Sequence, residues 1–473
     1  MIAKNKFESS LEVPVPVSQL FSWHENPGAF ERLTPPFDPV KIKKKKGGID
    51  GGEVHLQIKL GPIPMTWIAK HYNYKKNVRF FDEQSSGPFA SWHHEHLFEK
   101  LDKKSSKLTD KIDYQLPLEP LGGIFGGAFT KSKIRQMFAY RRNITKNDLQ
   151  SQSKYKGKTL DIAVTGGSGL IGTDLVPYLT TAGHSVEKIV RGRPQKGELS
   201  WNPRKGTISS LERKDAVVHL AGEPISKPIG GMIPLPWTKW KRKEILESRV
   251  NGTKLIAEHI ASLNNPPEVL VCASAIGYYG DRGDALLSEN AKNGNDYFSQ
   301  VVKEWENAAQ PAIDAGVRVV FLRIAPVMSP LGGALQVLGN AAKLGPSPPV
   351  AGGKQWWSWI SIDDVIDVIY HSIISKKLSG PVNVASPKPV RQKEWASTLA
   401  NVVWGKLGFV SGLVSVPGFA LKTFLGEFGD VLALSSIKVD SSKLANSGYK
   451  FRFEDLEDCF RHLLGKRKQE ELL

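Results

Sequence analysis

A glycine-rich segment, Thr165 to Gly172 (TGGSGLIG), directly follows an apolar run and opens a helical pattern. The apolar run, Leu160–Val164, has the composition of a buried strand. Glycines at a strand-to-helix turn permit a tight turn, close approach of backbone N–H groups to a ligand, and close packing of helix on strand. The start of a helix favours an anion such as a pyrophosphate. The segment therefore predicts an α/β fold with a dinucleotide at this turn. The expected contact residues are Gly166, Ser168, Gly169, Leu170, Ile171 and Gly172.

Beyond this turn, strand-like runs alternate with helical runs. The strand-like runs are Val186–Val190, Ala216–Leu220, Val269–Ser274 and Val317–Ile324. The helical runs are Leu170–Ala182, Thr238–Ser262 and Phe298–Ala315. This alternation predicts βαβ units and a doubly wound parallel sheet of the Rossmann type. We expect a nucleotide-binding core over residues 159–325. Residues 326–473 then supply the remaining strands and a small C-terminal lobe over the substrate.

Two arginines follow the second predicted strand of this sheet, Arg191 and Arg193. An acidic residue at this point binds the ribose 2′-hydroxyl of NAD, whereas arginine suits a 2′-phosphate. The sequence therefore favours NADP(H) over NAD(H). The alternative is that the two arginines are exposed loop residues that do not contact the cofactor. Small residues after the third strand are expected on the adenine side of the cofactor. These residues are Leu220, Ala221 and Gly222, followed by Glu223.

The first 145 residues have a different pattern. A strand-like run, Phe7–Val13, is followed by two short helical stretches at Val17–Trp23 and Pro27–Leu33. Further short strand-like runs occur at Val54–Leu60, Met65–Lys70, Val78–Asp82, Ser91–Glu99 and Lys107–Tyr114. An amphipathic helix over Phe129–Arg142 closes the segment. The spacing predicts an antiparallel meander with a C-terminal helix, an α+β domain over residues 1–145. The polar residues 146–158 are predicted to be a linker.

Several strings resemble the extended short-chain dehydrogenase/reductase superfamily: TGGSGLIG, HLAG, RVNGT and WISIDDV. Longer strings resemble epimerase-family oxidoreductases of the cell-division-inhibitor-homologue group, over about residues 160–465: LAGEPIS, SAIGYYGDRGD, LRIAPVMSPLGGAL and QWWSWISIDD. The element order of residues 1–145, with DKIDY and MFAYRR, resembles a START-like or polyketide-cyclase-like helix-grip domain. That resemblance implies a curved sheet around a long helix, and a hydrophobic cavity that holds an apolar ligand.

The superfamily's proton chemistry uses a tyrosine, a lysine four residues later and a serine that polarises the substrate carbonyl. Ser274 is the best serine candidate, although Ala275 occupies the usual slot. Tyr297 opens the next helical run, but the residue four positions later is Val301. The Tyr-x-x-x-Lys pair is therefore absent, and the resemblance implies cofactor binding rather than the usual proton-transfer groups.

Tyr278 is a substitute acid, because it stands at the C-terminal end of the fourth predicted strand, where open α/β sheets bind ligands. Arg282 or Lys303 would be its neighbouring cation. The alternative is that Tyr278 and Tyr279 only pack against nicotinamide or substrate. Tyr279 is assigned to the substrate cleft.

Three tryptophans, Trp356, Trp357 and Trp359, are expected to form an aromatic wall of the substrate cleft, or else to pack between core and C-terminal lobe. His184 and His219 are expected to be structural, since neither has a metal-ligand partner. No metal site is predicted, and the two cysteines give no disulfide framework.

The net charge is +17, and its densest run is Lys41–Lys46. No aromatic residues interleave with these lysines, so a solvated hairpin is favoured over nucleic-acid binding, and an anionic membrane is a further alternative. No apolar run reaches the length of a membrane span. The sequence predicts a cytoplasmic protein with no transmembrane segment. The resemblance to the superfamily implies, as an expectation, a homodimer through the two long helices, Thr238–Ser262 and Phe298–Ala315.

The sequence thus predicts an NADP(H)-binding epimerase-family oxidoreductase that acts on a small-molecule substrate and carries an apolar ligand in its first domain. The alternative is a catalytically inert nucleotide-binding regulatory protein that acts through partner or membrane contacts. The missing tyrosine–lysine pair favours the alternative, because fold alone does not fix activity.

Overall fold

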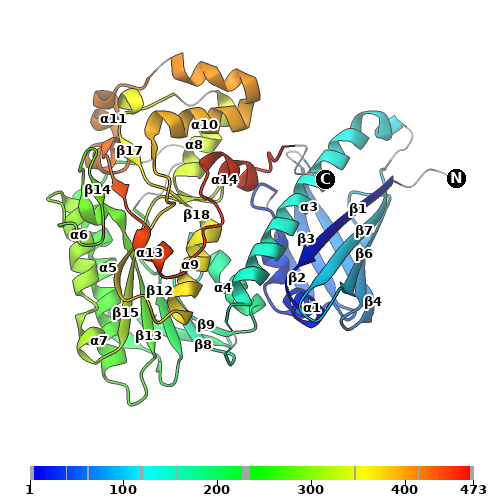
Figure 1. Ribbon diagram of the computed structural model, residues 1–473, viewed down its shortest axis with the longest axis horizontal. Helices are drawn as coiled ribbons and strands as arrows, with labels where there is room; N and C mark the ends of the chain where they lie inside the picture. Colours follow the sequence, from blue (N-terminus) through cyan, green and yellow to red (C-terminus); the bar gives the residue numbers. More distant parts are fainter. Residues whose placement is uncertain are drawn as a thin grey trace. The chain divides into compact units, whose positions relative to one another are not determined.

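A computed structural model describes residues 5–38, 40–60, 63–117, 121–155, 157–225, 235–345, 348–413 and 415–468. The chain forms two compact units (Figure 1). The first comprises Met1–Gly157 with Thr180–Gly183 and Leu464–Leu473. The second comprises Lys158–Leu179 and His184–Leu463. No helix among the described residues is long and apolar enough to cross a membrane.

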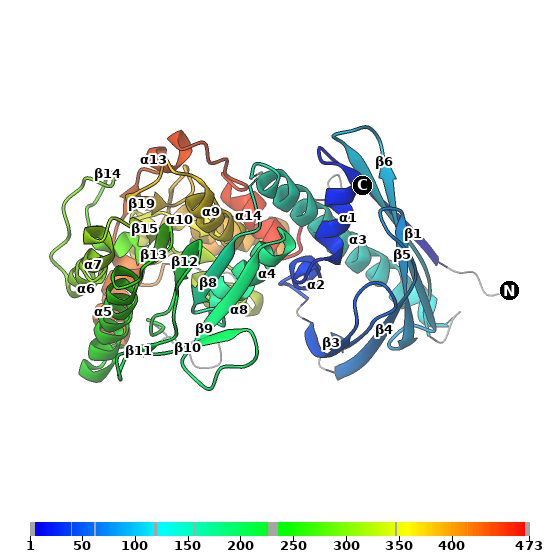
Figure 2. The ribbon, with the colours of Figure 1, turned by 90° about the horizontal axis from the view of Figure 1, so that it is seen from below.

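The first unit is an antiparallel sheet with helices packed on one face, seen edge-on in Figure 2. Its strands follow the order β1-β7-β6-β5-β4-β3-β2. The strands are β1 (Asn5–Val13), β2 (Lys41–Lys46), β3 (Glu53–Leu60), β4 (Ile63–Lys75), β5 (Arg79–Ser86), β6 (Ser91–Lys100) and β7 (Ser106–Gln115). The helices are α1 (Val17–Glu25), α2 (Ala29–Leu33) and α3 (Leu121–Gln152). Apolar side chains of α1 and α3, among them Phe21 and Ile144, share one core with Phe80 and Phe98 of the sheet.

Every residue of β2 is exposed, and this strand forms the edge of the sheet. Lysines on an edge strand oppose pairing with another chain, because their charges repel and need water. The run Lys41–Lys46 is therefore an exposed edge strand, paired with β3 in an antiparallel hairpin.

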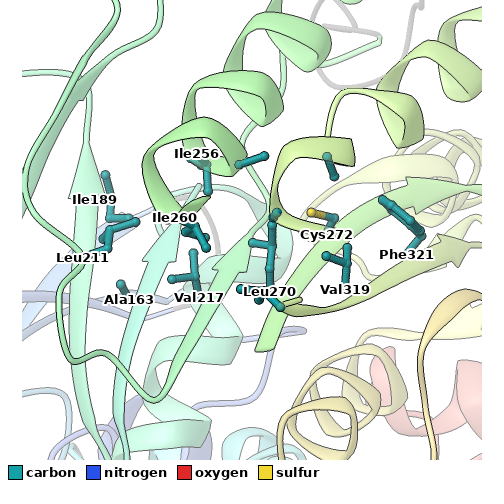
Figure 3. Close-up of a cluster of buried hydrophobic side chains, with 14 of the residues drawn as sticks. Ala163, Ile189, Leu211, Val217, Ile256, Ile260, Leu270, Cys272, Val319 and Phe321 are labelled. Atoms are coloured by element: carbon teal, nitrogen blue, oxygen red, sulfur yellow. The ribbon is translucent and has the colours of Figure 1, made fainter. Parts of the chain in front are cut away.

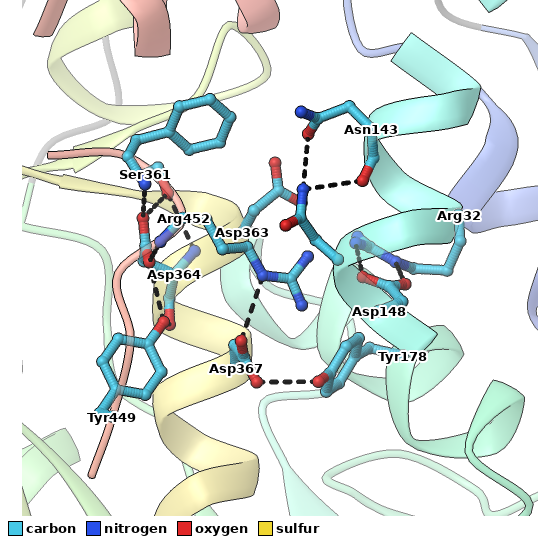
Figure 4. Close-up of polar contacts among 12 residues, drawn as sticks. Arg32, Asn143, Asp148, Tyr178, Ser361, Asp363, Asp364, Asp367, Tyr449 and Arg452 are labelled. Carbon is cyan, nitrogen blue, oxygen red and sulfur yellow. Dashed lines mark hydrogen bonds and ion pairs between the residues drawn. The ribbon is translucent and has the colours of Figure 1, made fainter. Parts of the chain in front are cut away.

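The prediction of a linker beginning at residue 146 was wrong, because α3 continues to Gln152. The composition of this stretch is polar, yet some of its polar groups are buried. Asp148 is fully buried and accepts hydrogen bonds from Arg32 Nε (2.8 Å) and Nη2 (2.9 Å), as Figure 4 shows. Leu149 joins the apolar core of the first unit. The helix therefore continues through polar residues because one of them, Asp148, is buried in an ion pair.

The second unit is built on a sheet of order β11-β10-β9-β8-β12-β13-β15-β19. Its strands are β8 (Asp161–Thr165), β9 (Ser185–Val190), β10 (Glu198–Asn202), β11 (Thr207–Ile208), β12 (Ala216–His219), β13 (Val269–Ala275), β15 (Arg318–Ile324) and β19 (Gly380–Val384). All neighbouring pairs are parallel except β10 with β11. The strand order reverses between β8 and β12, which is the point where doubly wound sheets bind ligands.

Helices cover both faces of this sheet (Figure 2). On one face, α5 (Lys239–Ala261) and α7 (Gln310–Asp314) bury side chains against the strands, and Figure 3 shows Ile256 and Ile260 above Val217 and Leu270. On the other face lie α4 (Leu170–Thr181) and α9 (Ile362–Ile374). The predicted doubly wound parallel sheet and N-terminal α+β unit are confirmed.

The predicted single helix over Phe298–Ala315 is two helices, α6 (Tyr297–Asn307) and α7. Pro311 lies in the first turn of α7. Proline has no N–H to donate, and its ring clashes with the carbonyl four residues earlier, so the first helix cannot pass through it.

A buried polar network joins α9 to the C-terminal segment (Figure 4). Asp364 accepts hydrogen bonds from the Tyr449 hydroxyl (2.8 Å) and from the Arg452 N–H (2.7 Å). Arg452 Nε lies 3.2 Å from Asp367, which also accepts from the Tyr178 hydroxyl at 2.9 Å. These contacts hold the segment around residues 449–453 on the helix.

Candidate functional site

The glycine-rich turn packs backbone to backbone on the end of β12. Gly166 has a φ of +70°, which few other residues adopt without strain, and a Cβ at this position would lie 2.8 Å from the carbonyl carbon of Leu220. A Cβ on Gly172 would lie 2.2 Å from the Gly166 carbonyl oxygen. A side chain at Gly166 would therefore push the turn away from the end of β12, and one at Gly172 would push α4 away from the turn. Ser168 and Gly169 are exposed at its tip.

Thr165 fixes this turn from below. Its hydroxyl accepts hydrogen bonds from the N–H groups of Leu220 (3.1 Å) and Ala221 (3.2 Å) and lies 2.7 Å from His219 Nδ1. Because it already accepts twice, it donates its own hydrogen to His219. Burial lowers the pKa of His219 to about 3, so the ring is neutral and able to accept. His219 is therefore structural. His184 is too, since its Nδ1 accepts from the Leu160 N–H at 3.2 Å.

The remaining predicted cofactor residues lie at the start of α4, after β9 and after β12. Leu170 and Ile171 begin α4, half-buried, and Leu220 to Gly222 leave the end of β12. Arg191 and Arg193 are exposed directly after β9. Glu223 lies nearby, but its carboxylate accepts from Lys241 Nζ at 2.7 Å and its carbonyl from Arg249 at 3.0 Å. The Glu223 side chain is thus already engaged within the protein.

Ser274 lies at the end of β13 and is only 4% exposed. Its hydroxyl donates to Glu306 Oε1 at 2.6 Å. The same carboxylate receives both Nε (2.9 Å) and Nη2 (2.8 Å) of Arg323. The hydroxyl proton therefore points into a buried ion pair.

Tyr279 belongs to the same buried network, which contradicts its assignment to a substrate cleft. It is fully buried; its hydroxyl donates to Asn383 Oδ1 (2.6 Å) and accepts from Arg323 Nη1 (3.1 Å). Burial raises the pKa of this hydroxyl to about 12. Sequence reasoning missed Arg323, although an arginine inside the apolar strand RVVFLRI is itself a sign of a buried charge pair.

Tyr278 is half-buried, and the Arg323 guanidinium lies over its ring, 3.5 Å from the centroid. Its hydroxyl makes no hydrogen bond within the part of the chain that the structure describes. The expected cations are placed elsewhere: Arg282 donates to backbone carbonyls, including that of Tyr279 at 2.8 Å, and Lys303 is exposed. Arg323 is therefore the cation that contacts Tyr278, and the prediction of Arg282 or Lys303 was wrong.

The three tryptophans separate into two groups. Trp359 is 1% exposed and donates to the Lys388 carbonyl at 3.1 Å, so it lies in the core and not on a cleft wall. Trp356 is half-buried, donates to Asp284 at 2.8 Å and lies under the Arg391 guanidinium at 4.0 Å. Trp357 is half-buried and packs against Trp395, which lies in the core. Only Trp356 and Trp357 keep surface that a ligand can contact.

Comparison with protein families matches residues 162–385 to the NAD dependent epimerase/dehydratase family. Residues 13–139 match the family of polyketide cyclases, dehydrases and lipid transport proteins. Residues 416–463 match a domain of unknown function, DUF1731.

Relatives cover this chain to different extents. An epimerase family protein of Mycobacterium bovis is 32% identical over 301 residues, which is 63% of this chain and 95% of that protein. The crystal structure of a nucleoside-diphosphate sugar epimerase from Corynebacterium glutamicum is 30% identical, with a TM-score of 0.79, over 98% of this chain and 95% of that one. The structure of the human epimerase family protein SDR39U1 with NADPH is 28% identical, with a TM-score of 0.59, over 64% of this chain and 99% of that one.

These matches agree with the resemblances seen in the glycine-rich segment and in the first unit. The two-unit architecture recurs along nearly the whole length of the Corynebacterium protein. This chain belongs to the epimerase family, in the form that carries an N-terminal polyketide cyclase-like domain and a C-terminal DUF1731 domain.

Proposed function

We propose that this protein binds a nicotinamide dinucleotide at the turn Gly166–Gly172 and exchanges hydride between it and a small-molecule substrate. One observation carries the proposal: at Gly166 and Gly172 a Cβ would collide with backbone, so the turn presents bare backbone at the start of α4. The first N–H groups of a helix have no partner within it, and they suit a pyrophosphate. When bound, the cofactor supplies hydride transfer at its nicotinamide ring.

NADP(H), which carries a phosphate on the ribose 2′-position, is favoured over NAD(H). Arg191 follows β9 and is exposed, and no acidic residue stands at the strand end to bind a ribose 2′-hydroxyl. Arginine binds a phosphate through charge-assisted hydrogen bonds. The NADPH in the structure of the human relative supports the same choice.

Tyr278 is the proposed acid or base. It stands at the end of β13 with a half-buried side chain, and Arg323 holds its ring in place through the contact at 3.5 Å. Ser274 does not polarise substrate in this proposal, because its hydrogen is donated to Glu306.

A second candidate function is nucleotide binding without catalysis. Two observations favour it: the Ser274 hydroxyl is engaged by Glu306, and Val301 stands where the superfamily has its lysine. In this case the protein acts through a partner or a membrane contact. Action in the cytoplasm and homodimer formation stay predictions under both candidates.

For the first unit we propose an apolar ligand. Trp92, Tyr114 and Phe138 form part of an apolar cluster between sheet and α3, with Trp67 and Phe89 packed against it. The indole N–H groups of Trp67 and Trp92 are buried without a hydrogen-bond partner among the described residues. A largely apolar ligand with one acceptor group suits such a cluster.

A fluorescence titration tests cofactor binding. NADPH and NADH are titrated into the wild-type protein, Arg191→Glu and the control Arg204→Glu, whose side chain is exposed in the β10–β11 turn. Arg191→Glu should weaken NADPH binding by about tenfold or more and spare NADH, since a charge-assisted contact contributes ~1.5–3 kcal/mol. The control should behave as wild type. Failure of the wild type to bind either nucleotide would overturn the proposal.

Catalysis is tested separately by NADPH oxidation with a panel of carbonyl substrates. A substrate turned over by the wild type and not by Tyr278→Phe, with NADPH affinity unchanged, supports the oxidoreductase. Binding of NADPH without turnover of any compound favours the second candidate.

A further inference from the structure

The first unit contains a cluster of two histidines and two aspartates on neighbouring strands of its sheet. Asp82 of β5 is directly opposite His94 of β6, and His96 of β6 is directly opposite Asp110 of β7. Because side chains alternate along a strand, His94 and His96 point to the same face. That face is the one covered by α3, whose Phe138 ring contacts the His94 ring.

Three atoms of this cluster converge. Asp82 Oδ2 lies 3.0 Å from His94 Nδ1 and 3.1 Å from His96 Nε2. One ligand atom from each of these three residues lies within 4.8 Å of the other two. A first-row metal ion bonds imidazole nitrogen and carboxylate oxygen at about 2.0–2.2 Å, so ligands around one ion must converge in this manner.

Asp110 contacts the opposite edge of both imidazole rings. Its Oδ1 lies 3.1 Å from His94 Nε2 and 2.7 Å from His96 Nδ1. Metal-binding histidines usually donate their second ring N–H to a carboxylate, which sets the tautomer and the ring orientation. Asp110 therefore stands where a positioning carboxylate belongs, next to the second nitrogen of each ring.

The cluster is largely buried and packs against aromatic rings. His94 is 3% exposed and His96 is 9% exposed. The Phe80 ring stacks on the His96 ring with centroids 4.2 Å apart. His96 Nδ1 is buried and lacks a well-directed hydrogen bond within the described residues, despite its short distance from Asp110. Asp110 is buried and Asp82 is half-buried, and a divalent cation matches the two negative charges of these carboxylates when both rings are neutral.

We infer that Asp82, His94 and His96 bind a divalent first-row transition-metal ion inside the polyketide cyclase-like domain, with Asp110 as the positioning residue. Two imidazoles and one carboxylate suit zinc, iron or a similar ion, whereas Mg²⁺ and Ca²⁺ prefer oxygen ligands. Three protein ligands leave coordination positions for water or for an oxygen atom of a small organic ligand. No metal site was predicted from the sequence, although His-x-His at positions 94 and 96 of a strand is a signal for one.

The test uses tag-free, full-length protein that has been treated with a chelator and dialysed. Co²⁺ is titrated while visible absorption is recorded, and Zn²⁺ and Mg²⁺ are then added as competitors. We expect one equivalent of Co²⁺ to bind, Zn²⁺ to displace it and Mg²⁺ to leave it in place. His94→Ala and His96→Ala should lose the spectrum. His93→Ala is the matched control, because His93 lies on the same strand with a side chain 45% exposed.

Asp110→Asn separates positioning from direct binding. It should keep one equivalent of Co²⁺ with affinity reduced by about 10–100-fold, the usual effect of removing an outer carboxylate. Circular dichroism establishes that each variant is folded. For the wild type, X-ray absorption of the bound ion should show two imidazole ligands and no sulfur, a result that needs no variant.

Three results would overturn the inference. The first is a wild-type protein that binds no stoichiometric metal, in which case the cluster is a proton-linked ion-pair network. The second is a folded His94→Ala or His96→Ala variant that binds Co²⁺ as the wild type does. The third is an absorption spectrum without imidazole ligation.

Discussion

The Ser274 hydroxyl donates a hydrogen bond of 2.6 Å to Glu306, a residue of α6, and thereby joins β13 to the helix that covers it. Glu306 in turn pairs with Arg323 of the next strand, which stands directly opposite Ser274 in the sheet. The serine that sequence comparison favours for catalysis thus stabilises a buried ion pair. Its hydrogen is not available to a substrate carbonyl in this arrangement.

Ser274→Ala should therefore lower stability and leave cofactor binding intact. A hydrogen bond to a charged group contributes about 1.5–3 kcal/mol, so a loss of that size in the free energy of unfolding is expected. Denaturant unfolding and an NADPH titration measure the two quantities. Ser210→Ala, at an exposed loop position, is the control and should change stability by less than about 0.5 kcal/mol. Full stability with lost NADPH turnover would instead place Ser274 in the chemistry.

Arg323→Met should be more damaging, because it leaves the Glu306 carboxylate buried and unpaired. Breaking one side of a buried ion pair costs about 3–5 kcal/mol of unfolding free energy. Glu306→Leu in the same chain removes the second charge, so the double variant should be more stable than Arg323→Met alone. Denaturant unfolding of the two single variants and the double variant gives the coupling. Additive losses would show that the two side chains do not stabilise each other.

The fold was largely predictable from the sequence, because hydrophobic periodicity and glycine placement determine it locally. The apolar run before Gly166 and the turn itself define β8 and α4 within a residue or two. Prediction failed where buried polar groups replace apolar ones. Asp148 lies in a polar segment that is typical of a linker, yet it pairs with Arg32 inside the first unit and belongs to α3. A single sequence does not show which distant charge compensates such a residue.

The candidate site was predictable in its backbone and less so in its side chains. The glycine turn lies where its spacing indicates, because steric limits at Gly166 and Gly172 are local. Tyr279 and Trp359 are buried in the core, where Tyr279 is hydrogen-bonded to Asn383 and Trp359 to the Lys388 carbonyl. Both partners lie far away in the sequence. Aromatic residues after a strand end indicate packing and ligand contact equally well, and only tertiary partners distinguish the two.

Gly172→Ala should weaken nucleotide binding. The added Cβ would lie 2.2 Å from the Gly166 carbonyl oxygen, so α4 must move away from the turn that is proposed to hold the pyrophosphate. The matched control is Gly192→Ala, also near the proposed site, because a Cβ there meets nothing within 4 Å. NADPH fluorescence titration should show a loss of about tenfold or more for the first variant, corresponding to ~1.4 kcal/mol or more, and none for the second. Equal affinities would mean that the nucleotide binds elsewhere.

The buried Asp364 should make stability depend on pH in a defined direction. Burial raises the pKa of this carboxyl to about 6 from its ordinary 3.8, even though Ser361, Tyr449 and backbone N–H groups donate to it. The folded state therefore holds a proton more tightly than the unfolded state does. The stabilisation from this group is complete below about pH 4 and is lost as the pH rises through 6, by roughly 3 kcal/mol at 1.36 kcal/mol for each pKa unit.

Asp364→Asn removes the titrating group while keeping its shape, so the comparison with wild type isolates this contribution. Denaturant unfolding of both proteins at pH 4, 5, 6 and 7 should show the wild type losing stability relative to the variant as the pH rises. The change should be confined to the interval between the two pKa values, because above it the group is ionised in both states. A difference that is constant across the series would mean that the donors from Tyr449 and the Arg452 N–H offset burial fully, and that Asp364 is ionised throughout.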